Sequence, residues 1–463
     1  MQRSQTSTEG SLYELVARGS KDKYFIEDSK TAAHPFDWRY ERWPSSIPEE
    51  RWTVPLNPAR FGSRCEFEFD LPGDVLTEAA LVIELPSWLP PEMIGSVGAS
   101  QTVDQNGVAY GYVNGIGYFL FERIEIYQDK ILIQEVSGDT LYASALTKGT
   151  WNQAYLTEKL AGIHDGSTLG IMRNAAPGRL EIPLPMIGCF PGDKGLPLCG
   201  LRQQPFRLRL TLRPLERLVE STTGAANPWL KTFTQTTTNG VVVLPAIPRD
   251  SIKQPTLFLR TKQLYLSNEA RIQLAKEVIE LSYIRYFDNV FTINQLDYAS
   301  IDNGAVGAIV RYLDANYTVE RILTYFRNNI DLGLNRLWNF RNSASADGQY
   351  YSGLQLTIAG KVREESWPPF VWQNVVGHAK EERSFSGLAI MNWTRGWRIE
   401  GGVREPTGGI NFTTADRPML SITLNNVVAD PVLGYKQVHM ISCCESWAIY
   451  KIRNGRGGLE YAN

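Results

Sequence analysis

Apolar and polar residues alternate along several segments of this chain, a pattern typical of antiparallel strands with one face in a core and the other in water. In residues 64–70 a cysteine and two phenylalanines alternate with four charged side chains. Residues 206–213 repeat the pattern, with apolar residues opposite three arginines and a threonine. A one-residue slip of this second segment would bury its arginines, so its pairing is tightly specified. Shorter strands are predicted at 80–85, 122–127, 130–134, 180–184, 257–266, 354–358, 419–424 and 447–452.

One amphipathic helix is predicted near the middle of the chain, at residues 268–280, where Ser267 or Asn268 can cap the first turn. Its apolar face consists of Ile272, Ala275, Val278 and Ile279. Residues 221–255, just before it, are rich in Thr, Asn and Gly and are interpreted as an excursion. Residues 90–117 are predicted to be a loop far longer than a hairpin needs, and such loops are usually functional or mobile.

The strand-rich regions on either side of the helix have the size of one sandwich or barrel domain each. We therefore predict an N-terminal arm at 1–50, a first β domain at 51–267 and a second β domain at 268–463 that starts with the linker helix. The arm carries seven basic and nine acidic residues, which does not fit a genome-packing tail. Its aromatic residues Phe36, Trp38, Tyr40 and Trp43 favour docking onto a protein surface over a disordered tail.

Composition narrows the class of function. The 463 residues carry 47 basic and 49 acidic side chains, a net charge of −2, so the chain does not coat nucleic acid by bulk charge, and we expect no sequence-specific nucleic-acid binding. The sequence has no apolar run of the roughly 18–20 residues that span a membrane. The first ten residues lack the apolar stretch of a signal peptide, so we expect the chain to remain in the cytosol unless it is carried elsewhere.

Candidate chemistry is sparse. Five cysteines are few for so long a chain and are expected to be free thiols, and four histidines form no spaced ligand cluster. We find no phosphate-binding loop, no pair of zinc-binding histidines on a helix and no nucleophile elbow. The glycine-rich run 454–458 is interpreted as a terminal turn, since too few residues follow it to build a helix that could bind phosphate. We predict no catalytic residue, no metal ligand and no cofactor-binding residue, and no enzyme activity.

Five groups of residues, in the expected order, resemble the major capsid proteins of large icosahedral eukaryotic DNA viruses, the nucleocytoplasmic large DNA viruses. Residues 404–420 (REPTGGINFTTADRPML) are similar to the family's Pro-Ser-Gly-x-x-Asn-Phe-Ser…Asp…Leu signature, with Thr at both Ser positions. Residues 447–461 end in the family's Gly-Gly-Leu-x-Tyr. The other groups are 69–76 with Leu85-Pro86, 182–185 with 195–201, and 264–271.

The resemblance covers the chain from about residue 52 to the C-terminus. It implies an all-β fold of two consecutive eight-stranded jelly-roll sandwiches, a double jelly roll, with a few short helices and long loops. It also implies a homotrimer that forms a pseudo-hexagonal capsomer and contacts neighbouring capsomers, with minor capsid and penton proteins under the shell. The implied location is the virion capsid, assembled in the host cytoplasm.

Two regions depart from the family pattern. Residues 314–346 and the loop at 92–117 do not resemble it, and both are expected on a variable outer surface together with 327–353. Two alternatives stay open. One is a capsid protein of a smaller double jelly-roll DNA virus or virus-like transposon. The other is a carbohydrate-binding β-sandwich that would use the tryptophans Trp367, Trp372, Trp393 and Trp397.

Overall fold

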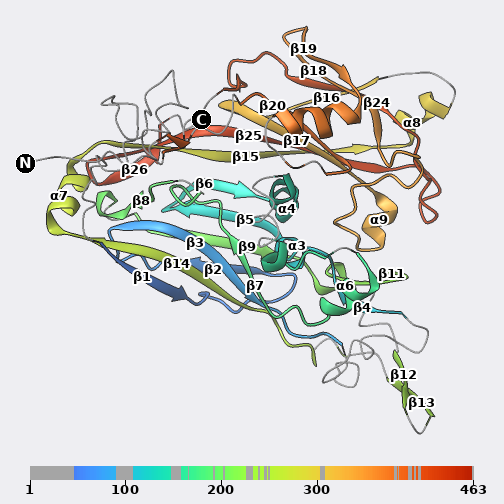
Figure 1. The fold of residues 1–463 in the computed structure, drawn as a ribbon, viewed down its shortest axis with the longest axis horizontal. Helices are drawn as coiled ribbons and strands as arrows, with labels where there is room; N and C mark the ends of the chain where they lie inside the picture. Colours follow the sequence, from blue (N-terminus) through green and yellow to red (C-terminus); the bar gives the residue numbers. More distant parts are fainter. Residues whose placement is uncertain are drawn as a thin grey trace, which may run out of the picture. The chain divides into compact units, whose positions relative to one another are not determined.

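The computed structural model describes most of the chain from residue 46 to residue 460 (Figure 1). The gaps are 90–107, 148–157, 165, 191–192, 202–203, 226–232, 238–239, 245–247, 249–250, 303–307, 380–382, 384, 395–398, 401–402 and 405–407. The predicted arm therefore lies outside the described residues up to residue 45, including its four aromatic side chains. The first strand begins at Ser46, so residues 46–50, which were assigned to the arm, belong to the folded part.

Eight strands build a sandwich in the first half of the chain. They are β1 (Ser46–Thr53), β2 (Arg64–Glu68), β3 (Val75–Glu84), β5 (Phe121–Gln128), β6 (Ile131–Val136), β7 (Arg179–Pro183), β9 (Phe206–Leu212) and β14 (Thr256–Leu266). Two sheets have the strand orders β1-β14-β3-β7 and β2-β9-β5-β6. Numbered from one to eight along the chain, these are a 1-8-3-6 sheet and a 2-7-4-5 sheet.

The second half repeats this arrangement with its own eight strands. They are β15 (Ile279–Ile293), β16 (Ala308–Tyr312), β17 (Thr318–Asn328), β18 (Tyr351–Ile358), β19 (Lys361–Trp367), β20 (Leu388–Asn392), β24 (Met419–Leu424) and β25 (Val438–Arg453). The sheet orders β15-β25-β17-β20 and β16-β24-β18-β19 are again 1-8-3-6 and 2-7-4-5. Two packed four-stranded sheets in this order form a jelly roll, so the predicted double jelly roll is confirmed.

The predicted alternation sets the register of the first sandwich. Cys65 and Phe67 of β2 lie opposite Leu210 and Leu208 of β9, and all four are fully buried. On the other face of the same strands, Arg209 Nε lies 2.8 Å from a carboxylate oxygen of Glu66. The period of two therefore separates a dry face from a wet face, as the sequence predicted.

The connections between strands differ strongly at the two ends of each half. Paired strands are antiparallel throughout both sandwiches, so the connections 1–2, 3–4, 5–6 and 7–8 lie at one end. In the first half they include the long segments 85–120, 137–178 and 213–255. We call this the loop-rich end.

At the opposite end the 4–5 connections are two-residue turns, at 129–130 and 359–360. Ala359 and Gly360 both have positive φ, at 52° and 71°, as tight hairpin turns require. Helix α7 (Asn268–Lys276) joins the eighth strand of the first half to the first strand of the second half at this end, which we call the α7 end (Figure 1).

The remaining elements lie in the connections, except β26, which follows β25. In the first half they are β4 (Tyr110–Tyr112), α3 (Ile116–Phe119), α4 (Gly138–Thr147), α6 (Thr168–Arg173), β8 (Leu196–Pro197), η2 (Leu198–Gly200), η3 (Leu215–Arg217), β10 (Val219–Ser221), β11 (Gly224–Ala225), β12 (Phe233–Thr237) and β13 (Gly240–Leu244). In the second half they are α8 (Gln295–Asp302), α9 (Asn329–Gly333), η5 (Val371–Val375), α10 (Val376–Ala379), β21 (Ile399–Glu400), β22 (Val403–Arg404), β23 (Ile410–Asn411) and β26 (Arg456–Leu459).

The predicted helix at 268–280 is present but shorter and more exposed than expected. Helix α7 ends at Lys276, because Ile279 already pairs with Ile452 as the first residue of β15. None of its side chains is buried, and Ile272 and Val278 are 53% and 55% exposed. The apolar spacing correctly predicted a helix. It also predicted that the apolar face would be buried, but this face is exposed in the described part of the chain.

The prediction of a long loop at 90–117 is wrong for residues 108–117. Residues 90–107 lie outside the described residues. Residues 109–117 are buried and include β4 and α3. Glycines there permit close packing, since a Cβ on Gly111 would lie 2.1 Å from the carbonyl oxygen of Ile171. A glycine-rich segment can therefore mark close backbone contact as well as a loop.

The expectation that 314–346 belongs to a variable outer surface is wrong for β17. Every residue of this strand after Thr318 is buried. Its side chains contribute to two apolar clusters: Ile322 and Phe326 to the core of the second sandwich, and Leu323 and Tyr325 to a cluster that continues from the core of the first. The strand therefore lies between the two halves.

Candidate functional site

The two halves meet where edge strand β6 and helix α4 of the first half pack on the 1-8-3-6 sheet of the second. Gln134 on β6 donates a hydrogen bond to the backbone oxygen of Ile284 (2.8 Å), and the Tyr283 hydroxyl donates one to the backbone oxygen of Ile133 (3.1 Å). All four groups are buried. A strand edge that would otherwise present polar backbone to water is therefore covered within the chain.

Helix α4 begins with a polar contact to this sheet. The hydroxyls of Ser137 and Thr140 each donate a hydrogen bond of 2.7 Å to the carboxylate of Asp288 on β15. Ser137 also accepts a hydrogen bond from the backbone N–H of Thr140, which satisfies a donor in the first turn of the helix. The same serine thus starts the helix and attaches it to the second half.

A buried ion pair lies further along the helix. Arg321 on β17 and Glu445 on β25 are 1% and 0% exposed, and Arg321 Nη2 lies 2.6 Å from Glu445 Oε1. From α4, the Ser144 hydroxyl lies 3.1 Å from Arg321 Nη2, and Thr147 Oγ1 accepts a hydrogen bond of 3.0 Å from Arg321 Nη1. Charges taken out of water need such extra partners, and removal of one partner leaves the other charge buried and alone.

A second buried charge cluster joins three segments. Asp139 on α4 lies 2.8 Å from Arg213 of the first half and 3.0 Å from Arg327 on β17. Burial alone raises the pKa of Asp139, but the two guanidinium groups outweigh it and hold the pKa well below its usual value. The Arg327 guanidinium also lies over the rings of Phe119 and Phe340, 5.5 and 5.4 Å from their centroids.

The sequence interpretation missed these charged residues at the junction. It assigned Arg213 to a wet strand face, yet the Arg213 side chain is only 13% exposed. A usable signal existed for the others, because Arg321 and Arg327 flank the mostly apolar stretch 322–326 and Glu445 interrupts a largely apolar strand. Charges in such strands are seldom fully buried unless they are paired.

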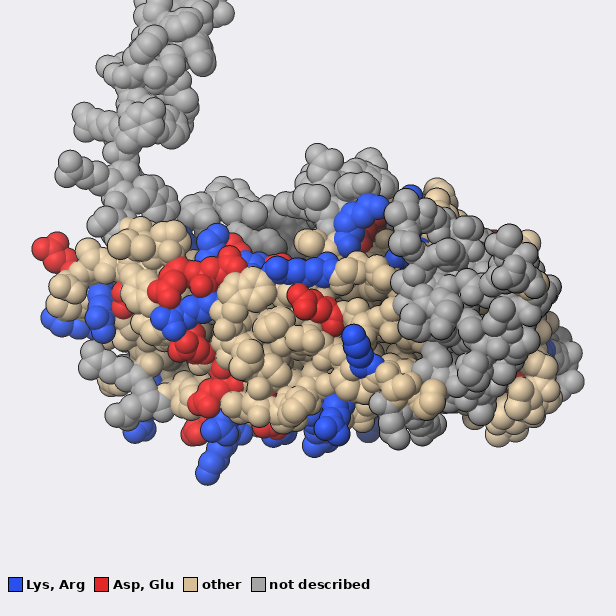
Figure 2. All heavy atoms as spheres, turned by 90° about the horizontal axis from the view of Figure 1, so that it is seen from below, with Lys and Arg blue, Asp and Glu red and all other residues tan. Residues whose placement is uncertain are grey.

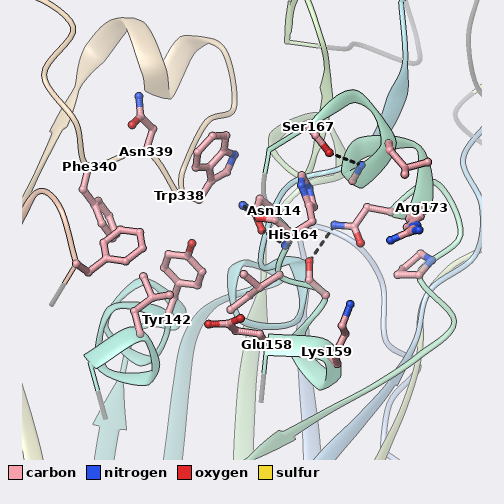
Figure 3. Close-up of a pocket in the computed structure, with 18 of the residues that line it drawn as sticks. Asn114, Tyr142, Glu158, Lys159, His164, Ser167, Arg173, Trp338, Asn339 and Phe340 are labelled. Carbon is pink, nitrogen blue, oxygen red and sulfur yellow. Dashed lines mark hydrogen bonds between the residues drawn. The ribbon is translucent and has the colours of Figure 1, made fainter. Parts of the chain in front are cut away.

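At the loop-rich end a cavity of about 750 Å³ opens between the two halves (Figure 3). In Figure 3, Trp338 and Phe340 of the second half face Asn114, Tyr142 and His164 of the first. Trp338 Nε1 donates a hydrogen bond of 3.2 Å to Glu220, whose other oxygen accepts 3.1 Å from the backbone N–H of Asn114. A buried carboxylate thus ties the loops of both halves together beside the cavity.

The 1-8-3-6 sheet of the first half, in contrast, has an open outer face. Arg260 on β14 is surrounded by Glu50, Glu78 and Glu181 from three neighbouring strands. Figure 2 looks at the chain from below Figure 1 and shows acidic and basic side chains interspersed with uncharged surface. The indole of Trp52, 43% exposed, lies 4.4 Å under the Arg179 guanidinium.

The structure also places the residues that the sequence singled out for chemistry. All five cysteines are free. Among the described residues, no group of three or more His, Cys, Asp or Glu side chains is arranged to hold a metal ion. Within the same part of the chain, no helix is long and apolar enough to cross a membrane.

The tryptophans of the carbohydrate-binding alternative do not form one exposed platform among the described residues. Trp372 is a core residue, 2% exposed, whose Nε1 donates to the backbone oxygens of Leu354 and Trp367. Trp393 donates a hydrogen bond of 2.8 Å to Glu364. Trp397 lies outside the described residues.

The fold and the junction define a double jelly roll, and solved structures of this class match the chain. No protein-family model and no curated protein sequence matches it. A quasi-atomic model of the PBCV-1 virus capsid is 14% identical with a TM-score of 0.67, covering 92% of this chain and 100% of that one.

Two further structures are similar over most of their length. The Faustovirus major capsid protein is 10% identical with a TM-score of 0.61, covering 89% of this chain and 91% of that one. A cryo-EM structure of the Sputnik virophage is 9% identical with a TM-score of 0.53, covering 96% and 92%. The chain therefore has the fold of these capsid structures.

Proposed function

We propose that this protein is the major capsid protein of a large double-stranded DNA virus and that it builds an icosahedral shell. The supporting observation is the duplicated 1-8-3-6 and 2-7-4-5 arrangement, which overlies the PBCV-1 capsid structure along 92% of the chain. A fold permits many functions. The tandem of two sandwiches, joined by a buried contact within one chain, is a strong argument for a shell subunit. The role is structural, and we assign no catalytic residue.

The architecture suits a building block of a shell. Two packed sheets make a stiff unit, and loops at one end can lengthen without disturbing the core. We assign residues 1–45 to an arm, 46–267 to the first jelly roll and 268–463 to the second; the arm is shorter than the 1–50 expected from the sequence because β1 begins at Ser46. The loop-rich end would face outward. The α7 end would face inward. Strand β1 starts at this end, so the proposed arm before it would leave the sandwich on the inner side of the shell, and β25 ends at the same end.

The proposed assembly is a homotrimer, in which two similar sandwiches per chain give six columns around the axis. Permanent contacts within the trimer would bury on the order of 2,000 Å² or more per pair of subunits. Contacts with neighbouring capsomers would be smaller and more polar. The arm would contact minor capsid and penton proteins under the shell, in a virion assembled in the host cytoplasm.

Electron microscopy of the purified full-length protein tests the proposal. We expect three-fold particles with a hexagonal outline in negative stain and a trimer mass by light scattering. A uniform population of monomers at micromolar concentration would contradict the proposed assembly. Binding of the monomer to a glycan array would instead favour the carbohydrate-binding alternative.

A further inference from the structure

The connection between β24 and β25, at the loop-rich end of the second half, contains a turn that reverses the usual placement of polar and apolar side chains. Residues 428–435 (VADPVLGY) carry a single charged residue, Asp430, which is only 4% exposed. Val432, two positions further on, is 90% exposed. Carboxylates are seldom buried without a purpose. The turn therefore spends a carboxylate inside the protein and presents an aliphatic side chain to water.

Several apolar side chains are exposed around this turn, and we call residues 428–435 the apolar tip. Besides Val432, they are Val428, Leu433 and Tyr435, which are 46%, 39% and 40% exposed. Helix α8 lies beside the base of the tip, because the side chain of Gln295 accepts a hydrogen bond of 2.9 Å from the backbone N–H of Lys436. The next residue of the helix, Leu296, is 81% exposed. A group of exposed apolar side chains of this kind marks a binding surface more often than a single one does.

The buried carboxylate fixes the shape of the apolar tip. Asp430 Oδ1 accepts hydrogen bonds from the backbone N–H groups of Val432 and Leu433, at 2.7 and 3.1 Å. Its other oxygen accepts a hydrogen bond from the side-chain amide of Asn329 at the start of α9. The two aliphatic side chains are thus held in one arrangement before any partner is met, which lowers the entropy that binding would cost.

The turn also satisfies its own backbone donors. The N–H of Gly434 donates to the backbone oxygen of Asp430 (2.8 Å), and the N–H of Asp430 donates to the backbone oxygen of Tyr435 (3.0 Å). Pro431 has no N–H. Together with the two bonds to the carboxylate, every backbone N–H of residues 430–434 has an acceptor within the tip. A protein partner can pair open N–H groups, but hydrocarbon offers no acceptor, so this arrangement favours a lipid surface.

The order of side chains along the tip fits the same partner. Val432 and Leu433 form an aliphatic apex, and Tyr435 and Lys436 follow at its base. Aromatic rings with a hydroxyl and long cationic side chains suit the level of lipid headgroups, while aliphatic side chains suit the acyl region. In Figure 1 the connection lies at the end of the second half that is opposite α7.

We propose that the apolar tip inserts into the surface of a lipid bilayer. Val432 and Leu433 enter the boundary between headgroups and acyl chains, Tyr435 lies among the headgroups, and Leu296 of α8 adds apolar contact beside them. The insertion is shallow and involves few side chains, so one tip binds weakly and several copies facing one membrane bind more tightly. The inference goes beyond the shell role and does not depend on how subunits are arranged.

Flotation of the full-length protein with vesicles of phosphatidylcholine alone tests the proposal. The measured quantity is the lipid concentration at which half of the protein floats with the vesicles. Val432→Asp places a charge at the apex and should raise this concentration at least about tenfold. The matched control is Val278→Asp, since Val278 is 55% exposed beside α7 at the opposite end of the second half, and it should bind like the wild type.

A second variant separates insertion of a preformed turn from simple apolar adhesion. Asp430→Ala removes a charge and keeps every apolar side chain, so adhesion alone would leave binding equal or make it stronger. Insertion predicts binding at least about fivefold weaker, because the N–H groups of Val432 and Leu433 lose their acceptor. Unchanged circular dichroism and thermal midpoints show that the variants are folded.

Three results would overturn the inference. They are a wild type that does not float with the vesicles, a Val432→Asp protein that binds like the wild type, and binding that requires phosphatidylserine and disappears in high salt. The last would show electrostatic adsorption in place of apolar insertion. The mass of the assembly by light scattering is measured without lipid, so a failure of the proposed shell function is recognised separately.

Discussion

The two fifth-strand edges of this protein occupy the same place in the same topology, yet only one is covered. At the first edge, eight of the ten residues of α4 are buried, and β6 hydrogen-bonds to the neighbouring sheet. At the second edge, β19 is exposed throughout apart from Glu364. The first edge is covered because α7 leads the chain from β14 into β15, a strand of the sheet that packs on this edge.

The covered edge also differs in chemistry. It is held by buried charges, Asp139, Arg321, Arg327 and Glu445, together with hydroxyls of α4. The open edge offers apolar side chains and exposed charges. A contact that forms during folding can bury ionic groups because they are paired as the core closes. A surface that is exposed in the free subunit must keep its charged groups solvated, so that the subunit remains soluble before a partner binds.

The largest expected effect comes from the buried pair at the covered edge. Glu445→Gln leaves the Arg321 guanidinium buried without its counter-charge, and we expect the free energy of unfolding to fall by about 3–5 kcal/mol. Urea unfolding followed by circular dichroism measures it. The matched control is Glu280→Gln, which removes the exposed partner of Lys451 and should change little. If the two variants lowered the free energy of unfolding equally, the buried ion pair at the covered edge would contribute no more to stability than an exposed ion pair.

The next largest effect is the loss of stability at low pH. The pKa of Asp139 is depressed in the folded state, so its contribution to stability is complete above the unfolded pKa of about 3.9 and is lost as the pH falls toward the folded pKa. Between pH 6 and pH 2 the wild type should lose roughly 2 kcal/mol more than Asp139→Asn, which lacks the titrating group. Parallel stability curves for the two proteins would show that the carboxylate does not carry this dependence.

A smaller effect is expected for Ser144→Ala. The Ser144 hydroxyl lies between Arg321 and Glu445. The ion pair between these two residues remains when the hydroxyl is removed, so the free energy of unfolding should fall by only about 1–2 kcal/mol. Ser366→Ala at the open edge is the comparison and should stay within about 0.5 kcal/mol of the wild type. The same urea titration compares them, and a larger loss at Ser366 would reverse the assignment of covered and open edges.

The smallest effect is expected at Phe370, measured at a dilution where the chain is monomeric. Phe370→Ala removes a side chain that is 67% exposed, so the free energy of unfolding should change by less than about 0.5 kcal/mol. A loss as large as that of a core residue would mean that Phe370 belongs to the packing of its own half, and the second edge would no longer count as open.

Local patterns predicted the strands well where one face meets water. The pairing of β2 with β9 follows directly from the alternation in 64–70 and 206–213, because a shift would bury arginine. The pattern failed where both faces are buried. In β17 the strand packs against both halves, so alternation disappears and the charges at Arg321 and Arg327 look like solvent contacts until their partners are known.

The sequence by itself determined the strand-rich class and the helix between two β regions, since each depends on neighbouring residues and on periods of two or 3.6. It also carried the family resemblance. Only the tertiary structure decided that α4 lies on the second sheet, that Glu445 meets Arg321 and that one of two equivalent edges stays open. These features depend on residues more than a hundred positions apart, and no local period records which distant surface will exclude water from a side chain.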